Sequence, residues 1–581
     1  MATVEGQRAI MLLLLLLALA QMSLTSSSPP PDPVACADGA SNCTITNAYA
    51  SYPDRRTCHA AKAAYPRTEQ ELVAAVAAAV AAKRKVKVAT RYGHSFTKLA
   101  CPGGNAGAII STRWLNRTVR VDARNRLITV ESGMTLRGLI SAAAEAGLAL
   151  PYTPYWFGLT VGGLLGTGAH GNSLWGKGGA VHEYVVALRI VTPAPASHGF
   201  AMVRELGTGH PDLDAAKVSL GVLGVISQVT LRLQPMFKRS ISFVKRDDTD
   251  LAEQVATWGR IHEFGDITWL PEERKVIYRQ DDRVDVSAPG DGFNDNLGFR
   301  PFSATELEAD RVQDDLLQEN GTDATRCTAI RTAEAYLESH AFGLTNDGVN
   351  FTGYPVVGYQ HRMQASGSCL DTKDDGLKSV CYWDPRIRGP FIYNTGLSVP
   401  LSRAPAFVAD LKRLRDRNPQ AFCVLGTSGV LMRYVKASTA YLGKPVDSLT
   451  VDIDYYRSHA SGTPRAHADM IDEIEQMALH KYGGLPHWGK NRNFAFHGAI
   501  AKFPRAGEFL KVKHRYDPEG TFSSEWSDQV LGIKGQSTNI LNMGCAMEGL
   551  CVCSDDSHCA PEKGYHCRPG KVYAEARVCA R

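Results

Sequence analysis

Residues 154–180 form a glycine-rich stretch that constrains the fold more than any other part of the sequence. The segment PYWFGLTVGGLLGTGAHGNSLWGKGGA holds nine glycines in 27 residues and shows neither helical nor strand periodicity. A loop of this length inside a compact domain usually serves a function. Successive backbone N–H groups without a Cβ beside them can surround a pyrophosphate. The stretch therefore predicts an anion-binding loop, and a turn-rich structural loop is the alternative.

The string GTGAHG at residues 166–171 matches the dinucleotide fingerprint G-x-G-x-x-G. In a Rossmann unit this fingerprint follows a strand, opens a helix and precedes an acidic residue by about 20 positions. Here it continues as NSLWGKGG, which is not typical of a helix. The context argues against a Rossmann nucleotide site.

Local patterns predict a chain of mixed α and β structure with short strands. Residues 68–83 read as a helix that begins at a capping threonine. Residues 85–90 alternate as a strand does and run directly into the loop RYGHS at 91–95. Further strands are expected at 108–110, 119–121, 127–130, 185–192 and 226–233, and a further helix at 135–146. Beyond residue 237, charged helices and irregular segments predict a second domain that extends to about residue 480.

The amino terminus has the pattern of a secretory signal peptide. Arg8 precedes a twelve-residue apolar run and then small and polar residues, which predicts a signal peptide at 1–26. Twelve residues are too few to cross a bilayer, which takes about 20 in a helix, so an uncleaved anchor is the weaker interpretation. We see no later apolar span and no hydrophobic tail for a lipid anchor. We expect a secreted, extracellular protein, with possible glycosylation at Asn42, Asn116, Asn320 and Asn350.

The charge balance excludes one large class of partners. The chain carries 64 Lys+Arg and 59 Asp+Glu, a net charge of +5 over 581 residues, and its longest basic run is residues 83–85. Nucleic-acid binding needs a basic patch or a higher charge density, so we expect no nucleic-acid partner.

Cysteines are concentrated at the carboxyl terminus. Six of the 14 lie in the last 46 residues, at positions 545, 551, 553, 559, 567 and 579. Such a density is typical of a disulfide scaffold, and export places it in an oxidising compartment. Zinc binding through these cysteines and His558 is the alternative. We expect disulfides and predict no metal site.

Taken together, several segments resemble a known flavoprotein family. The strand ending in RYGHS, LTVGG at 159–163 and the GTGAHG string are similar to the FAD domain of the vanillyl-alcohol oxidase family. PHWGK at 486–490 and YDPEGTF at 516–522 look like the carboxyl-terminal signatures of its sugar-1,4-lactone oxidases. The resemblance covers about residues 60–530. It implies an α+β fold with a two-subdomain FAD-binding domain of the p-cresol methylhydroxylase (PCMH) type, an α+β substrate (cap) domain and a small disulfide-rich tail.

The expected domain boundaries follow from the resemblance and the composition. After the signal peptide we expect a linker at 27–57, the FAD-binding domain at 58–236, the cap domain at 237–484, a segment returning to the flavin at 485–535 and the cysteine-rich tail at 536–581.

The resemblance also implies how FAD is held. In covalent members the histidine of the matching Gly-His-Ser bonds the 8α-methyl of the flavin, which implies one covalent link at His94. Relatives with two links carry a cysteine before the second loop, and residues 155–160 contain none. Pro154 is similar to the oxidase type of residue that admits oxygen to the flavin, and a rigid turn residue beside Tyr155 is the alternative. The other implied FAD-binding residues are Arg91, Tyr92, Gly93, Ser95, Gly162, Gly163, Gly166, Thr167, Gly168, His170 and Gly171.

On the substrate side the sequence departs from the family pattern. Lactone oxidases carry Glu-x-Arg on one strand, whereas this chain has Leu431 and Arg433. The resemblance implies that Arg433 and Lys490 act on the substrate. Asp452 or Asp454 could supply the missing carboxylate, but their alternating strand favours an orientation toward solvent. His487 and Trp488 could belong to the site or to the core.

The expected activity is therefore that of a secreted FAD-dependent oxidase of a sugar-1,4-lactone. The most similar family reaction converts L-gulono-1,4-lactone to L-ascorbate while molecular oxygen is reduced to hydrogen peroxide. An oxidase of another sugar, oligosaccharide or alcohol is the first alternative, because the glutamate is missing. A catalytically silent flavin-fold protein that binds a cell-wall or extracellular partner through its tail is the second.

Overall fold

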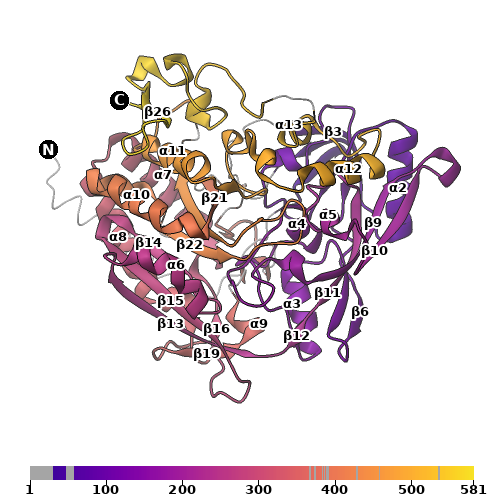
Figure 1. The fold of residues 1–581 in the computed structure, drawn as a ribbon, viewed down its shortest axis with the longest axis horizontal. Coiled ribbons are helices and arrows are strands. Elements are labelled where there is room, and N and C mark those ends of the chain that lie inside the picture. Colours follow the sequence, from indigo (N-terminus) through magenta and orange to yellow (C-terminus); the bar gives the residue numbers. More distant parts are fainter. Residues whose placement is uncertain are drawn as a thin grey trace.

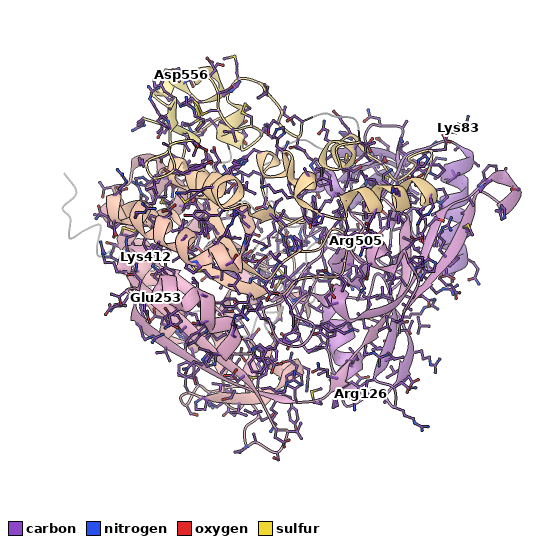
Figure 2. The ribbon with its side chains drawn as sticks, viewed as in Figure 1. Lys83, Arg126, Glu253, Lys412, Arg505 and Asp556 are labelled. Carbon is purple, nitrogen blue, oxygen red and sulfur yellow. A yellow bond between two sulfur atoms is a disulfide. The ribbon has the colours of Figure 1, made fainter. Side chains whose placement is uncertain are left out.

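The computed structural model describes residues 31–46, 58–364, 368–371, 375–382, 384, 386–387, 392–426, 429–456, 458, 460–533 and 537–581. The predicted signal peptide at 1–26 lies outside these ranges. Within them, no helix is both long and apolar enough to cross a bilayer. The expected α+β class is confirmed. Exposed charged side chains such as Lys83, Arg126 and Glu253 lie on the periphery of the molecule (Figure 2).

Two five-stranded sheets build the amino-terminal half, which is indigo to purple in Figure 1. The first has the order β1 (Val34–Asp38), β2 (Ser41–Ile45), β3 (Cys58–Ala64), β5 (Ala108–Ser111) and β4 (Val86–Ala89). A disulfide between Cys36 and Cys43 joins β1 to β2. The expected linker at 27–57 thus contains two strands, and that prediction is wrong for residues 34–45. A five-residue strand fixed by a disulfide and by its neighbour is too short to show a clear hydrophobic period.

The second sheet and its helices follow most of the sequence predictions. Its order is β10 (Ala201–Gly207), β9 (Val185–Pro193), β11 (Val225–Arg232), β7 (Leu127–Glu131) and β6 (Thr118–Asp122). Helix α2 (Glu69–Ala81) begins after the capping residue Thr68 and buries Leu72 and Val76 against this sheet. Helix α3 (Leu136–Glu145) is also confirmed. Short elements complete this half: α5 (Leu213–Ala216), β8 (Leu148–Ala149) and β12 (Gln234–Pro235).

The glycine-rich stretch is not entirely irregular. Residues Val161–Gly166 form the short helix α4, a helix that the sequence did not predict. Glycine disfavours helix, but Val161, Leu164 and Leu165 are almost fully buried and their packing outweighs that propensity. The helix leads directly into the GTGAHG string.

The cap domain is built on an eight-stranded antiparallel sheet. Its order is β19 (Val356–Tyr359), β13 (Lys238–Asp247), β15 (Lys275–Val284), β14 (Ile267–Leu270), β22 (Val430–Val435), β23 (Ser448–Tyr456), β21 (Ile392–Pro400) and β24 (Leu485–Pro486). The prediction of charged helices and irregular segments missed this sheet. Strands such as β13 and β15 carry charged residues at many positions, so their sequence does not read as a buried strand.

Helices cover one face of the cap sheet and leave the other face to a cavity. Helices α6 (Leu251–Ile261), α10 (Ala404–Arg417) and α11 (Ala468–Gln476) pack with Met432, Tyr434 and Val451 in one core. Because strand side chains alternate, the residues between these point to the opposite face. Helices α7 (Ala304–Asn320), α8 (Asp323–Ser339) and α9 (Gln360–Met363) and the short strands β16 (Phe293–Asn294), β17 (Phe302–Ser303), β18 (Leu344–Thr345) and β20 (Ser379–Val380) complete the domain.

The chain after β24 returns to the amino-terminal half, as the position of α12 (Ala506–Tyr516) and α13 (Glu525–Val530) in Figure 1 shows. The ring centroid of Phe96 lies 5.8 Å from that of Phe496 and 5.0 Å from that of Trp526, so this segment shares the core beside the loop at residues 91–95. Asp517 of the YDPEGTF motif accepts hydrogen bonds from the backbone N–H groups of Thr521 and Phe522, each at 2.7 Å. The motif is therefore a turn that buries Phe522.

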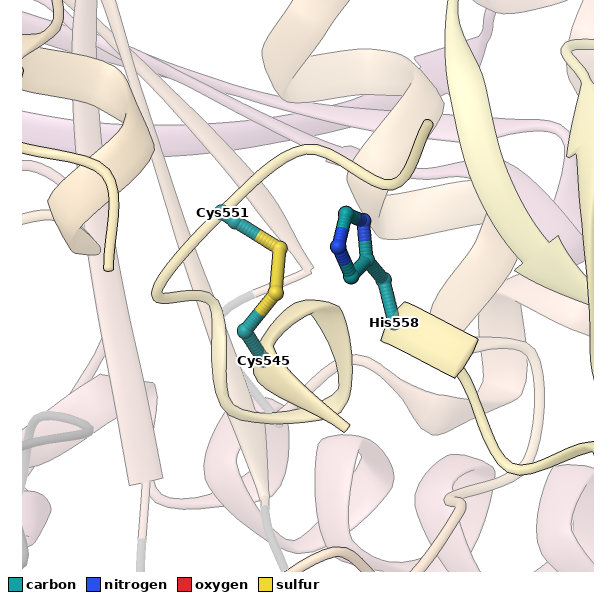
Figure 3. Close-up of side chains that lie close together, drawn as sticks. All are labelled: Cys545, Cys551 and His558. Atoms are coloured by element: carbon teal, nitrogen blue, oxygen red, sulfur yellow. A yellow bond between two sulfur atoms is a disulfide. The ribbon is translucent and has the colours of Figure 1, made fainter. Parts of the chain in front are cut away.

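The carboxyl-terminal tail is held by three disulfides: Cys545–Cys551, Cys553–Cys567 and Cys559–Cys579. The expected disulfide scaffold is confirmed. His558 lies beside the first of these, as Figure 3 shows, but both sulfur atoms are bonded to each other and cannot serve as thiolate ligands to zinc. The four remaining disulfides are Cys36–Cys43, Cys58–Cys101, Cys327–Cys423 and Cys369–Cys381, so all 14 cysteines are paired.

The tail docks on α11 through one carboxylate. Glu473 accepts hydrogen bonds from the backbone N–H groups of Lys571, Val572 and Tyr573 at 2.6 to 2.7 Å. The amide of Gln476 on the same helix exchanges two hydrogen bonds with the backbone of Arg577. These contacts fix the tail to the cap domain.

Candidate active site

A cavity of about 3040 Å³ is lined by the amino-terminal half, the cap sheet and the returning segment. Small-ligand pockets usually measure about 300–1,000 Å³. The cavity therefore has room for a dinucleotide-sized group together with a substrate.

The first predicted loop follows β4 and forms one wall of this cavity. Tyr92, Gly93, His94 and Ser95 line it, whereas Arg91 does not and stacks on the Tyr92 ring instead. Gly93 has φ of +54°, and a Cβ there would lie 2.8 Å from a Pro33 side-chain carbon. Only glycine suits this position.

His94 is a neutral imidazole on the cavity wall. Its ring centroid lies 4.8 Å from that of Trp156. Burial, assisted by the charge of Lys490, lowers the pKa of His94 to about 3. The ring therefore keeps a lone pair at neutral pH.

The glycine-rich loop supplies a second wall. Gly162, Gly163, Gly166, Thr167 and His170 line the cavity, as does Pro154, whereas Gly168 and Gly171 do not. A Cβ on Gly171 would lie 2.7 Å from the Thr153 carbonyl oxygen, and Gly168 has φ of +64°. These two glycines shape the loop instead of lining the cavity.

The wall between these loops carries unsatisfied polar atoms. Ser132 Oγ, Thr160 Oγ1 and His170 Nε2 are buried and have no hydrogen-bond partner among the described residues. All three residues line the cavity. Because buried polar atoms in native proteins are nearly always hydrogen-bonded, these atoms fit a polar ligand in this part of the cavity.

Arg433 and Lys490 meet at a third residue, Asp452. Arg433 donates to Asp452 Oδ2 through Nε at 2.9 Å and also through Nη2, and Lys490 Nζ lies 2.7 Å from Asp452 Oδ1. Asp452 is only 7% exposed. The expectation that it faces solvent is wrong, because the outward side of β23 is not free but faces the cavity. The two predicted residues, Arg433 and Lys490, thus form an ion cluster with the carboxylate of Asp452.

The charges of this cluster are mutually stabilised. Burial alone raises the pKa of Asp452, but Arg433 and Lys490 outweigh it and hold that pKa well below its usual value. Arg433 Nη1 lies 3.5 Å from the His170 carbonyl oxygen, which ties the cluster to the glycine-rich loop. Arg433 has five N–H groups, so donors remain for a substrate.

Leu431 occupies the expected glutamate position. It lines the cavity two residues before Arg433, and its partner across the β22–β23 ladder is Asp452. A carboxylate is thus present beside this position, although it comes from the neighbouring strand. Asp454 also lines the cavity two residues further along β23.

A second charged group at the cavity could not be recognised from sequence motifs. The hydroxyl of Tyr155 donates to Asp266 Oδ2, which also lies 3.0 Å from Arg279 Nη2. Burial raises the pKa of Asp266 above its usual value although Arg279 opposes this. Tyr155 follows Pro154 in the glycine-rich stretch, whereas Asp266 immediately precedes β14 and Arg279 lies on β15, in cap segments without a motif.

The PHWGK segment divides between site and core. His487, Gly489 and Lys490 line the cavity. Trp488 is 3% exposed, donates to the Leu442 carbonyl oxygen at 2.9 Å and stacks on Phe503. A Cβ on Gly489 would lie 2.9 Å from Ser95 Oγ, so the absence of a side chain lets this segment approach the first loop.

Three family profiles match the chain, and together they define a class. "FAD binding domain" matches residues 60–195, "D-arabinono-1,4-lactone oxidase" matches 388–530, and "L-gulonolactone oxidase 2-like, C-terminal domain" matches 542–581. Solved cholesterol oxidases share the fold: a solvent-stable enzyme with a TM-score of 0.60 at 17% identity, and one from Brevibacterium sterolicum with 0.62 at 14%. Each comparison covers 87% of this chain and all of that chain. The chain is an FAD-dependent oxidoreductase of the PCMH-type fold that acts on CH–OH groups with oxygen as acceptor.

Comparison with curated proteins narrows the class. The chain is 56% identical over 554 residues to L-gulonolactone oxidase 2 of Arabidopsis thaliana, covering 95% of this chain and 93% of that protein. It is 54% identical to L-gulonolactone oxidase 5 of the same plant, covering 94% and 93%. The mouse L-gulonolactone oxidase is 23% identical, covering 77% and 90%. The chain belongs to the L-gulonolactone oxidase family.

Proposed function

We propose that this protein is a secreted oxidase that converts L-gulono-1,4-lactone to L-ascorbate and reduces oxygen to hydrogen peroxide, with FAD attached through His94. The observation that carries the proposal is the buried Arg433–Asp452–Lys490 cluster on the wall that faces both flavin loops. A catalytically silent protein would have no need for three ionised groups held in a cavity, because burying charges is costly.

When bound, FAD would accept a hydride from the carbinol carbon and pass its electrons to oxygen. The residues of loops 92–95 and 162–170 would hold it, with Ser132, Thr160 and His170 as polar partners. Arg433 retains N–H donors that can orient the lactone hydroxyls, and Lys490 adds a positive charge that favours a developing alkoxide. The cluster with Asp452 fixes both cations in place before substrate arrives.

His94 is suited to a covalent link because its ring is neutral and lies at the cavity wall. The test is acid precipitation of purified protein followed by flavin fluorescence of the pellet. We expect the fluorescence to remain with the chain and to be lost in His94→Ala. His198→Ala, at a histidine outside the cavity, is the control and should keep the flavin. Flavin in the supernatant of the unaltered protein would show that the link is absent.

The substrate is tested with a panel and peroxide detection. We expect L-gulono-1,4-lactone to give the highest kcat/KM, with one peroxide formed for each lactone oxidised. Leu431 at the glutamate position and the size of the cavity favour a second candidate, the oxidation of a larger sugar or oligosaccharide. The panel therefore includes other aldonolactones, alditols and short oligosaccharides. A preference for one of these would replace the lactone assignment, and no peroxide from any of them would favour the silent protein.

Secretion and the role of the tail are part of the proposal. Seven disulfides support folding in an oxidising compartment. Asn42, Asn116 and Asn350 are exposed and open to glycosylation, and the Asn320 side chain lies outside the described residues. Expression of the full chain in plant cells should yield extracellular protein that shifts in mass on deglycosylation. Removal of residues 537–581 tests whether the tail retains the protein at the cell wall.

A further inference from the structure

We propose that Asp454 accepts the proton of the substrate hydroxyl, as the general base of the reaction. The inference rests on the proposed function and deepens it, because oxidation of a CH–OH group releases one proton that needs an acceptor. Asp454 lies on β23 two residues after Asp452, so both side chains point to the cavity.

The two aspartates differ in how their oxygens are engaged. Both oxygens of Asp452 are bound to cations, Oδ1 to Lys490 and Oδ2 to Arg433. Asp454 Oδ1 accepts a hydrogen bond from Asn394 Nδ2, its cross-strand partner on β21. Asp454 Oδ2 has no hydrogen-bond partner among the described residues, and the side chain is only half-buried. One oxygen of Asp454 is therefore available to a hydroxyl in the cavity.

Two other candidate bases near the cluster are less suited. Asp266 is covered by the Tyr155 hydroxyl and paired with Arg279. His170 Nε2 is unpartnered among the described residues, but burial and the nearby Arg433 lower the pKa of its ring to about 3. Burial instead raises the pKa of Asp454 above its usual value, although Asn394 and Lys490 oppose this. A carboxylate of raised pKa is the stronger base.

The substrate O–H bond breaks and its proton bonds to Asp454 Oδ2, which becomes a neutral carboxyl. The C–H bond breaks at the same carbon, and its two electrons leave with the hydrogen as hydride to the oxidised flavin. The C=O bond forms from the hydroxyl oxygen's electrons. The carboxyl then releases its proton to water in the cavity and returns to the charged state.

The test compares holoenzyme with Asp454→Asn, which keeps the shape but cannot accept the proton. With L-gulono-1,4-lactone, or the best substrate of the panel, we expect kcat to fall by about 100-fold or more. Lactone binding, measured by equilibrium dialysis, should change by less than about threefold, since the site still forms. Asp454→Glu should recover part of kcat. Asp247→Asn makes the same change at an ion-paired aspartate of β13 outside the cavity and should leave kcat unchanged.

The pH profile gives a readout that a purely structural role would not move. The unaltered enzyme should lose kcat as pH falls through the pKa of Asp454, because protonation removes the base, and Asp454→Asn should lack this limb. Asn394→Ala keeps the carboxylate but removes the hydrogen bond that stabilises its charge, so the limb should move to higher pH. The charged and titratable groups that also face Asp454 are Asp452, Lys490, Arg433 and Tyr456.

Two outcomes would overturn the inference in different ways. An active unaltered enzyme whose Asp454→Asn variant keeps kcat within threefold and the same acidic limb would show that Asp454 is not the base. If Asp454→Asn does not fold, the Asn394→Ala variant decides. An acidic limb of its kcat–pH profile at the same pH as in the unaltered enzyme would also show that Asp454 is not the base. An unaltered holoenzyme that oxidises no CH–OH compound would instead contradict the proposed function itself.

Discussion

Leu431 on β22 and Asp452 on β23 are cross-strand partners on the cavity face of the cap sheet. Leu431 lies two residues before Arg433 on the same strand, and the Asp452 carboxylate beside it on the adjacent strand is bound to Arg433. The side chains of directly opposite strand residues lie about 4.5–5.5 Å apart at Cβ. A carboxylate moved between these two positions would therefore stay within reach of the same arginine.

This relationship predicts what happens when the carboxylate is moved from position 452 to position 431. Asp452→Asn should destabilise the fold by about 3 kcal/mol and sharply lower kcat, because the buried Arg433 and the partly buried Lys490 lose their counter-charge. Adding Leu431→Glu to that variant should recover part of both. Leu431→Gln in the same background introduces a side chain of nearly the same size as glutamate but without the charge. It should recover neither stability nor kcat. Denaturant unfolding and stopped-flow flavin reduction measure the two effects, and equal recovery by glutamine would refute the charge argument.

The glycine-rich loop predicts two separable effects. Gly171→Ala should lower the melting temperature, because its Cβ would lie 2.7 Å from a backbone oxygen that cannot move cheaply. Gly166→Ala meets no atom within 4 Å and should keep the fold, but it should reduce flavin content because the position lines the cavity. The ratio of visible to protein absorbance reports flavin content. A normal flavin content in Gly166→Ala would show that FAD does not approach this residue.

A buried carboxyl away from the active site predicts a pH-dependent stability. Glu334 on α8 is 4% exposed beside Glu272 and Glu273. Burial, and then repulsion from Glu272, raise its pKa well above the usual value. A raised carboxyl pKa gives stability that is complete below the unfolded pKa of about 4.5 and is lost as pH rises toward the folded pKa.

We therefore expect Glu334→Gln to stabilise the protein by at least about 1 kcal/mol at pH 8, with a smaller effect at pH 5. Glu253→Gln, at an exposed glutamate of α6, is the matched control. Denaturant unfolding at both pH values measures the difference. If the gain in stability did not change with pH, its cause would be packing and not the ionisation of Glu334.

The docking of the tail predicts a proteolysis result. Glu473→Gln should loosen the tail, because the uncharged amide cannot accept three backbone N–H groups as strongly as a carboxylate does. Cleavage near residues 537–544 should become faster. Asp469→Asn on the same helix removes only an ion pair to the half-exposed Lys571 and should have little effect. Equal cleavage rates in both variants would contradict the role of Glu473.

Sequence patterns predicted the amino-terminal half well and the cap domain poorly. Thr68 and the residues after it form a helix whose cap and apolar spacing are both local, and β4 lies within the predicted strand at 85–90. The cap strands depend on partners far along the chain, as with Val430 and Trp269. Their charged residues form buried ion pairs such as Arg239 with Asp281 instead of facing water. A local pattern cannot reveal such pairs.

The candidate site shows the same division. Motifs located His94, Arg433 and Lys490, and all three line the cavity. Asp452 was placed on the wrong side, because alternation reveals that two faces exist but not which face is covered. Asp266 had no motif, since its role depends on a side-chain hydrogen bond from Tyr155, which lies 111 residues earlier in the chain. Both omissions are long-range contacts.

The disulfide between Cys58 and Cys101 encloses the whole first flavin loop, including His94, within one covalent ring. Both cysteines belong to the amino-terminal half, so no residue of the cap domain is part of this ring. In recombinant protein made in a reducing cytosol, the Cys58–Cys101 disulfide would not form, and the loop would be unconstrained when FAD binds. The choice of production host therefore becomes part of any measurement of flavin content.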